Sequence, residues 1–434
     1  MADHSRLLLF TGDFPRGRGE TFLEPELPFL AAGFDRVTVF PASLPAGRRP
    51  VPANVEVDIS LGEALRDVSP SNHRWNRKAR AVVRQLAYHP RLACLAAMRG
   101  VTAPRQCHRA MATAARISVI ADWFAKKCRE WEALTTPCLV YCYWTTYLIC
   151  GLRLGAAELG IRLPIVSRAH GYDLYEEIRG DEDWPFRRET IGSVDHVFCI
   201  SEHGLQYLLA RHPRLQGRAS LSRLGVVDVP GSPDPPDTNE VRFCSCSLLR
   251  PVKRVDRIIE GLAMVARSHP DQRIRWDHLG EGGLMAELRA LAGRILPGSV
   301  EYRFWGSLDN RAVREFYQKH PVDAFLNVSV SEGVPVSIME AQCAGIPVIA
   351  TAVGGTPELV NDENGRLLGT DPTAAEVAEA MGYVIVNRSD WAARRALSRR
   401  QWEFLSNAHS NFPQFVRQLQ DVVGLGAAAV GDSG

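Results

Sequence analysis

The sequence has ten cysteines but lacks the spacing that a zinc site requires. No Cys-x2-Cys pair occurs, and no neighbouring histidine stands at a spacing that indicates zinc. Most of the cysteines lie inside apolar runs, and Cys244 and Cys246 are expected on one face of a single strand. We therefore expect reduced core residues in a cytoplasmic protein rather than metal ligands.

The sequence also lacks a signal-peptide core and a clear membrane span. The apolar run Arg6–Phe10 is too short for a signal peptide. The longest uncharged stretch, Thr135–Leu152, contains Tyr, Thr and Pro and is better explained as a strand followed by a helix. The glycine-rich turn Gly12–Gly19 does not have the Gly-x-Gly-x-x-Gly spacing of dinucleotide-binding folds, so a dehydrogenase loses its main support.

Acidic residues are missing from one long segment. Val68–Ala121 contains ten Lys or Arg and no Asp or Glu, although the whole chain carries a net charge of only +2. Trp75, Tyr88 and several aliphatic residues alternate with the arginines, which resembles a surface that holds anionic lipid head groups. The alternatives are a solvated basic face or nonspecific affinity for nucleic acid. Because no nucleic-acid-binding fold signature accompanies the segment, we expect no nucleic acid partner.

A chain of 434 residues with 46% hydrophobic and 23% charged residues is globular and long enough for two domains. The Pro-rich stretch Asp228–Thr238 cannot continue a helix or a central strand, so it predicts a linker. The expected parts are a first α/β domain at 1–228, a linker at 229–239, a second α/β domain at 240–398, a helix at 399–422 and a tail at 423–434.

Buried strands alternate with helical patterns in both halves. The first half is predicted to place strands at 6–11, 35–41, 138–144, 164–176 and, as its last buried strand, 196–201. The glycine-rich turn leads to a helix that is expected to start near Glu20 and Thr21. Near the end of the chain, Trp402–Leu419 is predicted to form one amphipathic helix.

One stretch of the second half carries the strongest functional signal. Ala324–Val328 is predicted as a buried parallel strand and Pro335–Ala344 as a helix, which places Glu332 at the carboxyl end of the strand and Glu340 inside the helix. Ligands collect at the carboxyl ends of strands in open α/β sheets, where a helix amino terminus attracts an anion. The pattern suits a nucleotide diphosphate that carries a sugar. An ordinary strand-loop-helix with two solvated glutamates is the alternative.

Several motifs occur in order with this stretch. Glu332 and Glu340 are followed by Ala344–Ala350 and then by Val353–Glu358. This segment resembles the donor-binding half of the retaining glycosyltransferases of family 4, in particular members that build bacterial surface polysaccharides or exopolysaccharides. The resemblance implies the GT-B fold, in which two Rossmann-like parallel-sheet domains face a cleft and the last helix crosses back to the first domain.

Further motifs extend the resemblance, with one departure. Pro251 and Lys253 match the diphosphate loop of that family, and 276–282 and 302–306 match two strand ends, the second near the nucleotide base. The usual arginine, five residues before the lysine, is replaced by Leu248, and Arg250 is a plausible substitute because arginine can bind phosphate bidentately.

The resemblance also assigns roles to individual residues. Glu340 would bind the ribose, Glu332 the transferred sugar, and Lys253 with Arg250 the leaving diphosphate, so that no metal is needed. His170 would lie near the anomeric carbon. The catalytic residues implied are His170, Glu332 and Lys253. The donor-binding residues implied are Gly19, Arg250, Lys253, Gly306, Glu332, Gly333, Val334, Pro335, Val336, Ser337 and Glu340. The acceptor-side residues implied are Glu20, Thr21, Tyr172 and Asp173.

The sequence thus favours a retaining, metal-independent glycosyltransferase without a cofactor. It would move a sugar from a UDP-, GDP- or ADP-linked donor to a hydroxyl of a glycan or polyprenyl-linked glycan in polysaccharide biosynthesis. The expected location is the cytoplasm, at the inner face of the cell membrane, with peripheral contact to anionic lipid. The rival hypotheses are a retaining glycan phosphorylase, for which no phosphate or pyridoxal phosphate site is found, and a noncatalytic sugar-nucleotide-binding scaffold.

Overall fold

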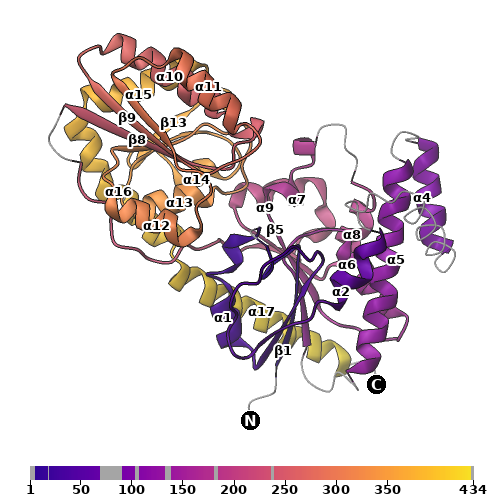
Figure 1. Ribbon diagram of the computed structural model, residues 1–434. Coiled ribbons are helices and arrows are strands. Elements are labelled where there is room, and N and C mark those ends of the chain that lie inside the picture. Colours follow the sequence, from indigo (N-terminus) through magenta and orange to yellow (C-terminus); the bar gives the residue numbers. More distant parts are fainter. Residues whose placement is uncertain are drawn as a thin grey trace. The chain divides into compact units, whose positions relative to one another are not determined.

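The computed structural model describes residues 5–17, 19–68, 90–102, 107–131, 138–179, 184–235 and 239–431. The chain forms two α/β units, which Figure 1 shows in sequence colours. The first unit comprises Met1–Ile200, Gly204–Ser222 and Phe412–Gly434, and the second comprises Ser201–His203 and Arg223–Asn411. In the described parts of the chain, no helix has an apolar stretch long enough to cross a membrane.

The first unit is built on a seven-stranded parallel sheet with the order β3-β2-β1-β4-β5-β6-β7. Its strands are β1 (Arg6–Thr11), β2 (Arg36–Pro41), β3 (Val55–Val57), β4 (Cys138–Cys142), β5 (Ile165–Ala169), β6 (His196–Cys199) and β7 (Ala219–Leu221). The strand at 196–201 is predicted as the last buried strand of this half, and β6 is buried as expected, but one further strand follows it. The short β7 follows it and pairs with β6, but its half-buried side chains give no apolar run in the sequence.

The helices and 3-10 turns of the first unit connect these strands. They are η1 (Thr21–Leu23), α1 (Leu27–Gly33), α2 (Ser60–Leu65), η2 (Arg66–Val68), α4 (Pro90–Thr102), α5 (Cys107–Glu130), α6 (Leu148–Ala157), α7 (Gly171–Leu174), η4 (Glu176–Arg179), α8 (Arg187–Ser193), α9 (Glu202–Arg211) and η5 (Pro213–Leu215). The α-helix expected near Glu20 begins only at Leu27, since Thr21–Leu23 forms a single 3-10 turn. Pro28 lies in the first turn of α1, where its missing N–H costs nothing.

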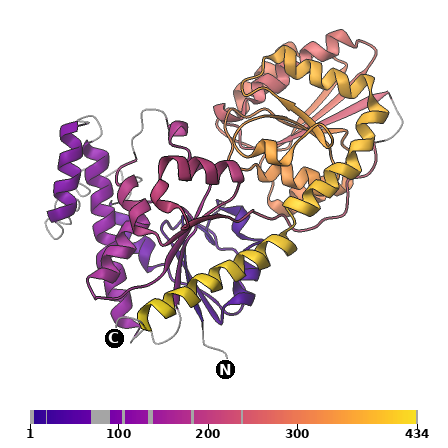
Figure 2. The same ribbon diagram turned by 180° about the vertical axis from the view of Figure 1, so that it is seen from behind.

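Alternate side chains of β1 bury both faces of the first sheet. Leu8 and Phe10 belong to a core that includes residues of α5 and α6, whereas Leu7 and Leu9 belong to a core that includes residues of α1 and α17 (Ala408–Gly431). Helix α17 contributes Phe415 to that second core and lies across this face of the sheet (Figure 2). Burial on both faces is typical of parallel strands and explains their continuous apolar runs.

The end of the chain forms two helices where the sequence predicted one. Trp402 lies in α16 (Arg388–Leu405), and α17 starts at Ala408. Between them, the N–H of Val226 donates to the carbonyl of Ser406 at 2.8 Å, and the N–H of Ala408 donates to the carbonyl of Val226 at 3.1 Å. The prediction of a single helix over 402–419 is therefore wrong, because the chain pairs with a distant segment at this point.

The second unit is built on a six-stranded parallel sheet with the order β10-β9-β8-β11-β12-β13. Its strands are β8 (Glu240–Cys246), β9 (Arg273–Leu279), β10 (Val300–Phe304), β11 (Ala324–Asn327), β12 (Val348–Thr351) and β13 (Gly365–Leu368). Its helical segments are η6 (Pro251–Lys253), α10 (Val255–Ser268), α11 (Met285–Ile295), α12 (Asn310–Lys319), α13 (Val336–Cys343), α14 (Thr356–Leu359), α15 (Ala374–Val386) and α16. Helices α10, α11 and α15 cover one face of the sheet, and α12, α13 and α16 cover the other (Figure 1). Both sheets confirm the predicted parallel α/β architecture.

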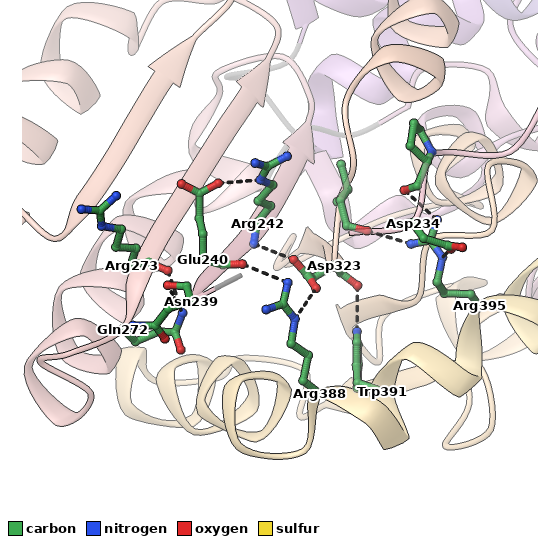
Figure 3. Close-up of polar contacts among 12 residues, drawn as sticks. Asp234, Asn239, Glu240, Arg242, Gln272, Arg273, Asp323, Arg388, Trp391 and Arg395 are labelled. Atoms are coloured by element: carbon green, nitrogen blue, oxygen red, sulfur yellow. Dashed lines mark hydrogen bonds and ion pairs between the residues drawn. The ribbon is translucent and has the colours of Figure 1, made fainter. Parts of the chain in front are cut away.

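A polar network fastens α16 to the amino edge of the second sheet (Figure 3). The carboxylate of Asp323, just before β11, accepts hydrogen bonds from the N–H of Arg242 at 2.8 Å and from Nε of Arg388 at 3.3 Å. The carbonyl of Asp323 accepts a bond from Nε1 of Trp391 at 2.9 Å, and Arg388 also donates to the carbonyl of Glu240 at 3.0 Å. Since β11 is fixed at its amino end, the loop at its carboxyl end starts from a rigid strand.

Removing the indole N–H of Trp391 is expected to weaken this attachment. Trp391 is 1% exposed, so Trp391→Phe keeps an aromatic ring in the core but takes the hydrogen-bond donor from the carbonyl of Asp323. The free energy of unfolding should fall by about 1–3 kcal/mol, as for other buried acceptors that lose their donor. Urea unfolding measures it, with Arg400→Gln on the exposed side of α16 as the control. A change in Trp391→Phe no larger than that of the control would contradict the assignment.

Candidate functional site

The loop after β11 leads into α13 at the carboxyl edge of the second sheet. Helix α13 begins at Val336, and the N–H groups of Val336 and Ser337 lie in its first turn, where the helix offers them no carbonyl. Such an amino terminus carries a partial positive charge and binds phosphate. Pro335 has no N–H to offer a ligand, and its carbonyl accepts the N–H of Ile338 at 3.0 Å.

Two glycines after β12 hold this loop in place. Gly354 has a φ of 52°, and a Cβ at this position would overlap the carbonyl oxygen of Glu332. Gly355 donates its N–H to the carbonyl of Gly333 at 2.7 Å. The Gly-Gly pair that the sequence placed after the glutamates is thus required by a close backbone approach, and it fixes the loop that carries Glu332.

Lys253 and Glu332 form an ion pair across the carboxyl edge. Nζ of Lys253, at the end of η6, lies 2.6 Å from Oε1 of Glu332, although the two residues are 79 positions apart. Nδ2 of Asn327, the last residue of β11, lies 3.4 Å from the same oxygen. The structure therefore brings together one predicted diphosphate ligand and one predicted sugar ligand, and the lysine holds the carboxylate in a fixed position.

Glu340 differs from Glu332 in having no hydrogen bond or ion pair from its side chain to any of the described residues. It lies in the second turn of α13, on the same helix whose amino terminus offers free N–H groups. Burial raises the pKa of its carboxyl to about 7, an effect that Arg314 partly offsets. A partly protonated, unpartnered carboxyl that follows an anion-binding helix turn is suited to accept hydroxyl hydrogen bonds from a ligand.

Two other predicted donor residues lie on neighbouring loops. Arg250 precedes η6 with an exposed side chain that makes no hydrogen bond or ion pair with the described residues, and Leu248 near it is 53% exposed. Gly306 follows β10 with a φ of 75°, its carbonyl accepts the N–H of Gly280 at 2.9 Å, and the space where its Cβ would lie is open. The structure leaves room for a ligand at Gly306 and gives Arg250 no fixed position.

A buried histidine that sequence reasoning missed supports the segment between β8 and η6. His278, in β9, is fully buried, and its Nδ1 lies 2.8 Å from Oγ of Ser245 while its Nε2 lies 3.3 Å from the carbonyl of Ser247. Burial lowers the pKa of His278 to about 4, so the ring is neutral. A lone histidine in a strand carries no sequence signal for this role, since its partners come from β8 and the residue after it.

The carboxyl edge of the first sheet carries the acceptor-side residues. The carboxylate of Glu20 accepts the N–H groups of Gly12 at 2.8 Å and of Asp13 and Phe14 at 2.7 Å each, and it also accepts Nε1 of Trp144. Glu20 adopts a left-handed backbone conformation with a φ of 49°, which these four bonds stabilise. Glu20 therefore acts as an internal anchor of the glycine-rich loop, which the sequence alone did not indicate.

His170 lies at the end of β5 among aromatic rings. It is 7% exposed, its ring centroid is 4.6 Å from that of Tyr143 and 4.7 Å from that of Trp144, and neither ring nitrogen has a hydrogen-bond partner in the described structure. Burial and the charge of Arg168 hold the pKa of His170 well below its usual value, so the imidazole is neutral. A neutral histidine has one ring nitrogen that donates and one that accepts, and it carries no charge.

The other acceptor-side residues have different environments. Asp173 is fully buried, and its carboxylate accepts the N–H groups of Thr145 and His170, each at 2.6 Å. Burial raises the pKa of Asp173 to about 7. Tyr172 is 61% exposed, and Thr21 begins η1. Asp173 therefore fixes the loop, while Tyr172 presents its side chain outward. Gly19 lies against Asp13, where a Cβ would collide with the Asp13 carboxylate.

Metal ligands do not cluster in the part of the chain that the structure describes. These ranges contain no group of three or more His, Cys, Asp or Glu side chains that could hold a metal ion. One Asp-x-Asp sequence, Asp181-Glu182-Asp183, occurs in the chain but lies outside the described residues. The expected metal independence stays a prediction.

Part of the second unit matches a known protein family, and the chain is similar to several glycosyltransferases. Residues 240–387 match the family model for glycosyl transferases, group 1. A GDP-mannose-dependent monoacylated alpha-(1-6)-phosphatidylinositol monomannoside mannosyltransferase of Corynebacterium glutamicum is 27% identical over 285 residues, which cover 58% of this chain and 70% of the relative. The gpi3 subunit of the Schizosaccharomyces pombe phosphatidylinositol N-acetylglucosaminyltransferase is 25% identical over 204 residues, which cover 46% of this chain and 43% of the relative, less than half of its length.

Solved structures agree with the architecture of both units. Anabaena HepE, determined in complex with UDP and glucose, superposes with a TM-score of 0.65 at 15% identity and covers 96% of this chain and 99% of its own. The lipopolysaccharide outer core galactosyltransferase WaaB superposes with a TM-score of 0.64 at 14% identity, and the match covers 96% of this chain and 98% of WaaB. The predicted GT-B fold is confirmed by these neighbours and by the two parallel sheets.

Proposed function

We propose that this chain is a retaining glycosyltransferase that moves a sugar from a nucleotide-sugar donor to a hydroxyl of a glycan or lipid-linked glycan. One observation carries the proposal. Within the segment that matches glycosyl transferases of group 1, an open helix amino terminus, a lysine-glutamate pair and an unpartnered glutamate converge at one sheet edge among the described residues. Phosphate, sugar and ribose each find a chemically suitable partner there.

Each group has a distinct task in this proposal. The amides at the start of α13 and the ammonium group of Lys253 would hold the diphosphate and stabilise the negative charge that develops on it when the glycosidic bond breaks. Glu332, positioned by Lys253, would accept hydrogen bonds from the transferred sugar, and Glu340 would accept those of the ribose. No metal is required for this charge stabilisation. The acceptor is assigned to the carboxyl edge of the first unit, where His170 lies.

The relatives narrow the donors worth testing. HepE was solved with UDP and glucose, and the Corynebacterium mannosyltransferase is named for GDP-mannose, so UDP- and GDP-sugars are the first candidates. The test is a panel of UDP-, GDP- and ADP-sugars in which release of the nucleoside diphosphate is measured, with Glu332→Gln and the exposed Glu63→Gln as the variant and its control. Release in wild type and in Glu63→Gln, but not in Glu332→Gln, is expected.

The same panel separates the rival functions. Release of a sugar phosphate that depends on added inorganic phosphate would identify a glycan phosphorylase instead. Binding of a nucleotide-sugar without any release, in the presence of mixed glycan acceptors, would identify a noncatalytic scaffold. Either result would overturn the proposed activity.

Peripheral membrane contact is a further part of the proposal. Part of the acid-free basic segment, including Arg74, Arg77, Lys78, Arg80 and Arg84, lies outside the described residues. Within the described α4, Leu95 is 37% exposed and Met98 is 61% exposed. Exposed apolar side chains beside a basic segment suit an anionic lipid surface.

Neutralising those five basic residues is therefore expected to weaken binding to anionic liposomes. Each basic side chain near such a surface contributes about 1 kcal/mol, and salt screens the effect within a Debye length. Cosedimentation with liposomes that contain or lack anionic lipid, at low and high salt, measures it. Binding that ignores lipid charge, salt and the substitutions would show that the segment is a solvated face and that the acceptor is not presented by a membrane.

A further inference from the structure

The glycine-rich loop of the first unit leaves one carboxylate oxygen unused. Both oxygens of Glu20 are occupied by backbone N–H groups and by Trp144. In the adjacent Asp13, by contrast, Oδ1 is buried and has no hydrogen-bond partner in the described structure. A buried acceptor without a donor is costly and calls for an explanation, which a ligand hydroxyl would supply.

The charge of Asp13 suits a hydroxyl donor. Burial and the neighbouring Glu20 carboxylate raise the pKa of Asp13 to about 6, so the group is mostly ionised at pH 7.5 and can only accept hydrogen bonds. Its backbone is tied to Glu20 and its side chain lies against Gly19, which keeps the carboxylate in one place.

Glu20, which lies beside Asp13, also accepts a hydrogen bond from the indole of Trp144, and this indole belongs to a group of aromatic rings. Trp144, which donates to Glu20, is partly exposed; its ring centroid lies 6.4 Å from that of the exposed Tyr172 and 5.9 Å from that of Phe22. His170 is more than nine-tenths buried and packs on the same indole, with the two ring centroids 4.7 Å apart. Neither ring nitrogen has a hydrogen-bond partner among the described residues, and Nδ1 lies 3.9 Å from Oδ1 of Asp173. Apolar ring faces next to unpaired polar groups match a pyranose, which has an apolar C–H face and a rim of hydroxyls.

The described cations of this loop are already engaged. Nε of Arg16 donates to the carbonyl of Pro45 at 3.1 Å, and Arg49 donates to the carbonyl of Gly19 and pairs with Glu24 at 3.0 Å. The charge of Arg49 still offsets part of the Asp13 charge, but both arginines are held by protein oxygens, so a phosphate on the acceptor would face the carboxylates of Asp13 and Glu20. Like charges placed together suppress binding of the wrong ligand.

We propose that Asp13, with the partly exposed rings of Trp144 and Tyr172, forms an acceptor subsite that takes a neutral sugar ring, one of whose hydroxyls donates to Oδ1 of Asp13. That the bound sugar is an acceptor rests on the proposed function. Binding of a neutral sugar at Asp13 can be measured even if the chain transfers no sugar. It also separates this chain from relatives whose names specify a phosphorylated inositol acceptor, such as the D-inositol 3-phosphate glycosyltransferase of Streptomyces coelicolor.

The test is direct binding of matched sugars, in which activity plays no part. Methyl α-glucoside, methyl β-galactoside and methyl α-mannoside are each compared with the corresponding 6-phosphate, by ligand-detected NMR and by quenching of tryptophan fluorescence. At least one neutral glycoside should bind more tightly than its phosphate, and Asp13→Ala should weaken it about tenfold, as expected for loss of a hydrogen bond to a charged group. Trp144→Phe should abolish the quenching signal, while Glu63→Gln should behave as wild type.

Correct folding of the variants is checked by urea unfolding, which reports on the first unit that contains Asp13. Asp13→Asn, which keeps an acceptor oxygen, should retain more affinity than Asp13→Ala. Equal or tighter binding of the sugar phosphates, no binding of any neutral glycoside, or an unchanged affinity in Asp13→Ala would overturn the proposal. If a neutral glycoside binds but no nucleotide-sugar is turned over, the subsite is supported and only the proposed glycosyltransferase activity is rejected.

Discussion

Lys253→Ala is expected to lower kcat for sugar transfer by about 10²–10³-fold, the loss seen when one preorganised donor is removed from a developing negative charge. In the structure Nζ of Lys253 lies 2.6 Å from Glu332, at the carboxyl edge where the amino terminus of α13 begins. The substitution removes the positive charge and also releases Glu332 from its fixed position. Initial rates with the donor identified from the panel measure the effect.

Lys319→Ala, on the exposed surface of α12, removes the same charge from the same unit and should leave the rate unchanged. Transfer should also survive chelation with EDTA, because the lysine and the helix amino terminus provide the positive charge that a metal supplies elsewhere. A Lys253→Ala enzyme with nearly full activity, or complete dependence on added magnesium or manganese, would contradict this assignment.

Glu340→Gln is expected to weaken nucleoside diphosphate and nucleotide-sugar binding equally, by about 100-fold. A carboxylate that accepts hydrogen bonds from two ribose hydroxyls contributes about 1.5–3 kcal/mol for each bond, and the amide replaces one acceptor oxygen by a donor. Glu332→Gln should behave differently. It removes the partner of Lys253 and leaves that cation available to phosphate, so nucleoside diphosphate affinity should be kept while nucleotide-sugar affinity falls.

Calorimetric titration of both ligands against both variants measures this division of roles. The matched control is Glu315→Gln in α12, which makes the same change on an outward-facing side chain of the same unit and should alter neither affinity. Equal losses of the two ligands in Glu332→Gln would contradict the division.

The pH dependence of nucleotide binding gives an independent check on Glu340. Burial raises the pKa of this carboxyl to about 7, so it is mostly protonated at pH 6 and mostly ionised at pH 8. Ligand hydroxyls bind the ionised form better, and affinity should therefore rise as the pH increases across this range. The phosphate groups of the ligand also titrate near pH 6 and change the affinity in the wild type and in Glu340→Gln alike. The rise in affinity that the wild type shows and Glu340→Gln lacks is therefore due to the Glu340 carboxyl.

Most of the features that the sequence predicts correctly depend on residues that are close together in the chain. The strand at 324–328, the loop with Glu332 and the helix with Glu340 follow from apolar runs, a Gly-Val-Pro turn and a proline near the helix start, all of which act locally. Lys253 and Glu332 were singled out separately by resemblance, but their direct ion pair joins residues far apart in the chain and was not predicted.

The missed features depend on contacts between distant segments. Glu20 accepts hydrogen bonds from backbone N–H groups of its own loop, and its bond from Trp144 joins the loop after β1 to the end of β4. No periodic pattern in the sequence marks either residue. The break between α16 and α17 depends on pairing with Val226, and the short β7 depends on its neighbour β6. Single-residue signals such as His278 or Asp13 become interpretable only when burial and partners are known.

Calorimetric binding of UDP, GDP and ADP, each compared with its monophosphate in excess EDTA, tests whether the second unit holds a nucleoside diphosphate without a metal. At least one diphosphate should bind far more tightly than its monophosphate, and Lys253→Ala should remove most of this difference. Equal affinity for the two members of every pair, or no binding of any nucleoside diphosphate, would contradict a nucleotide-sugar site at the carboxyl edge of the second sheet.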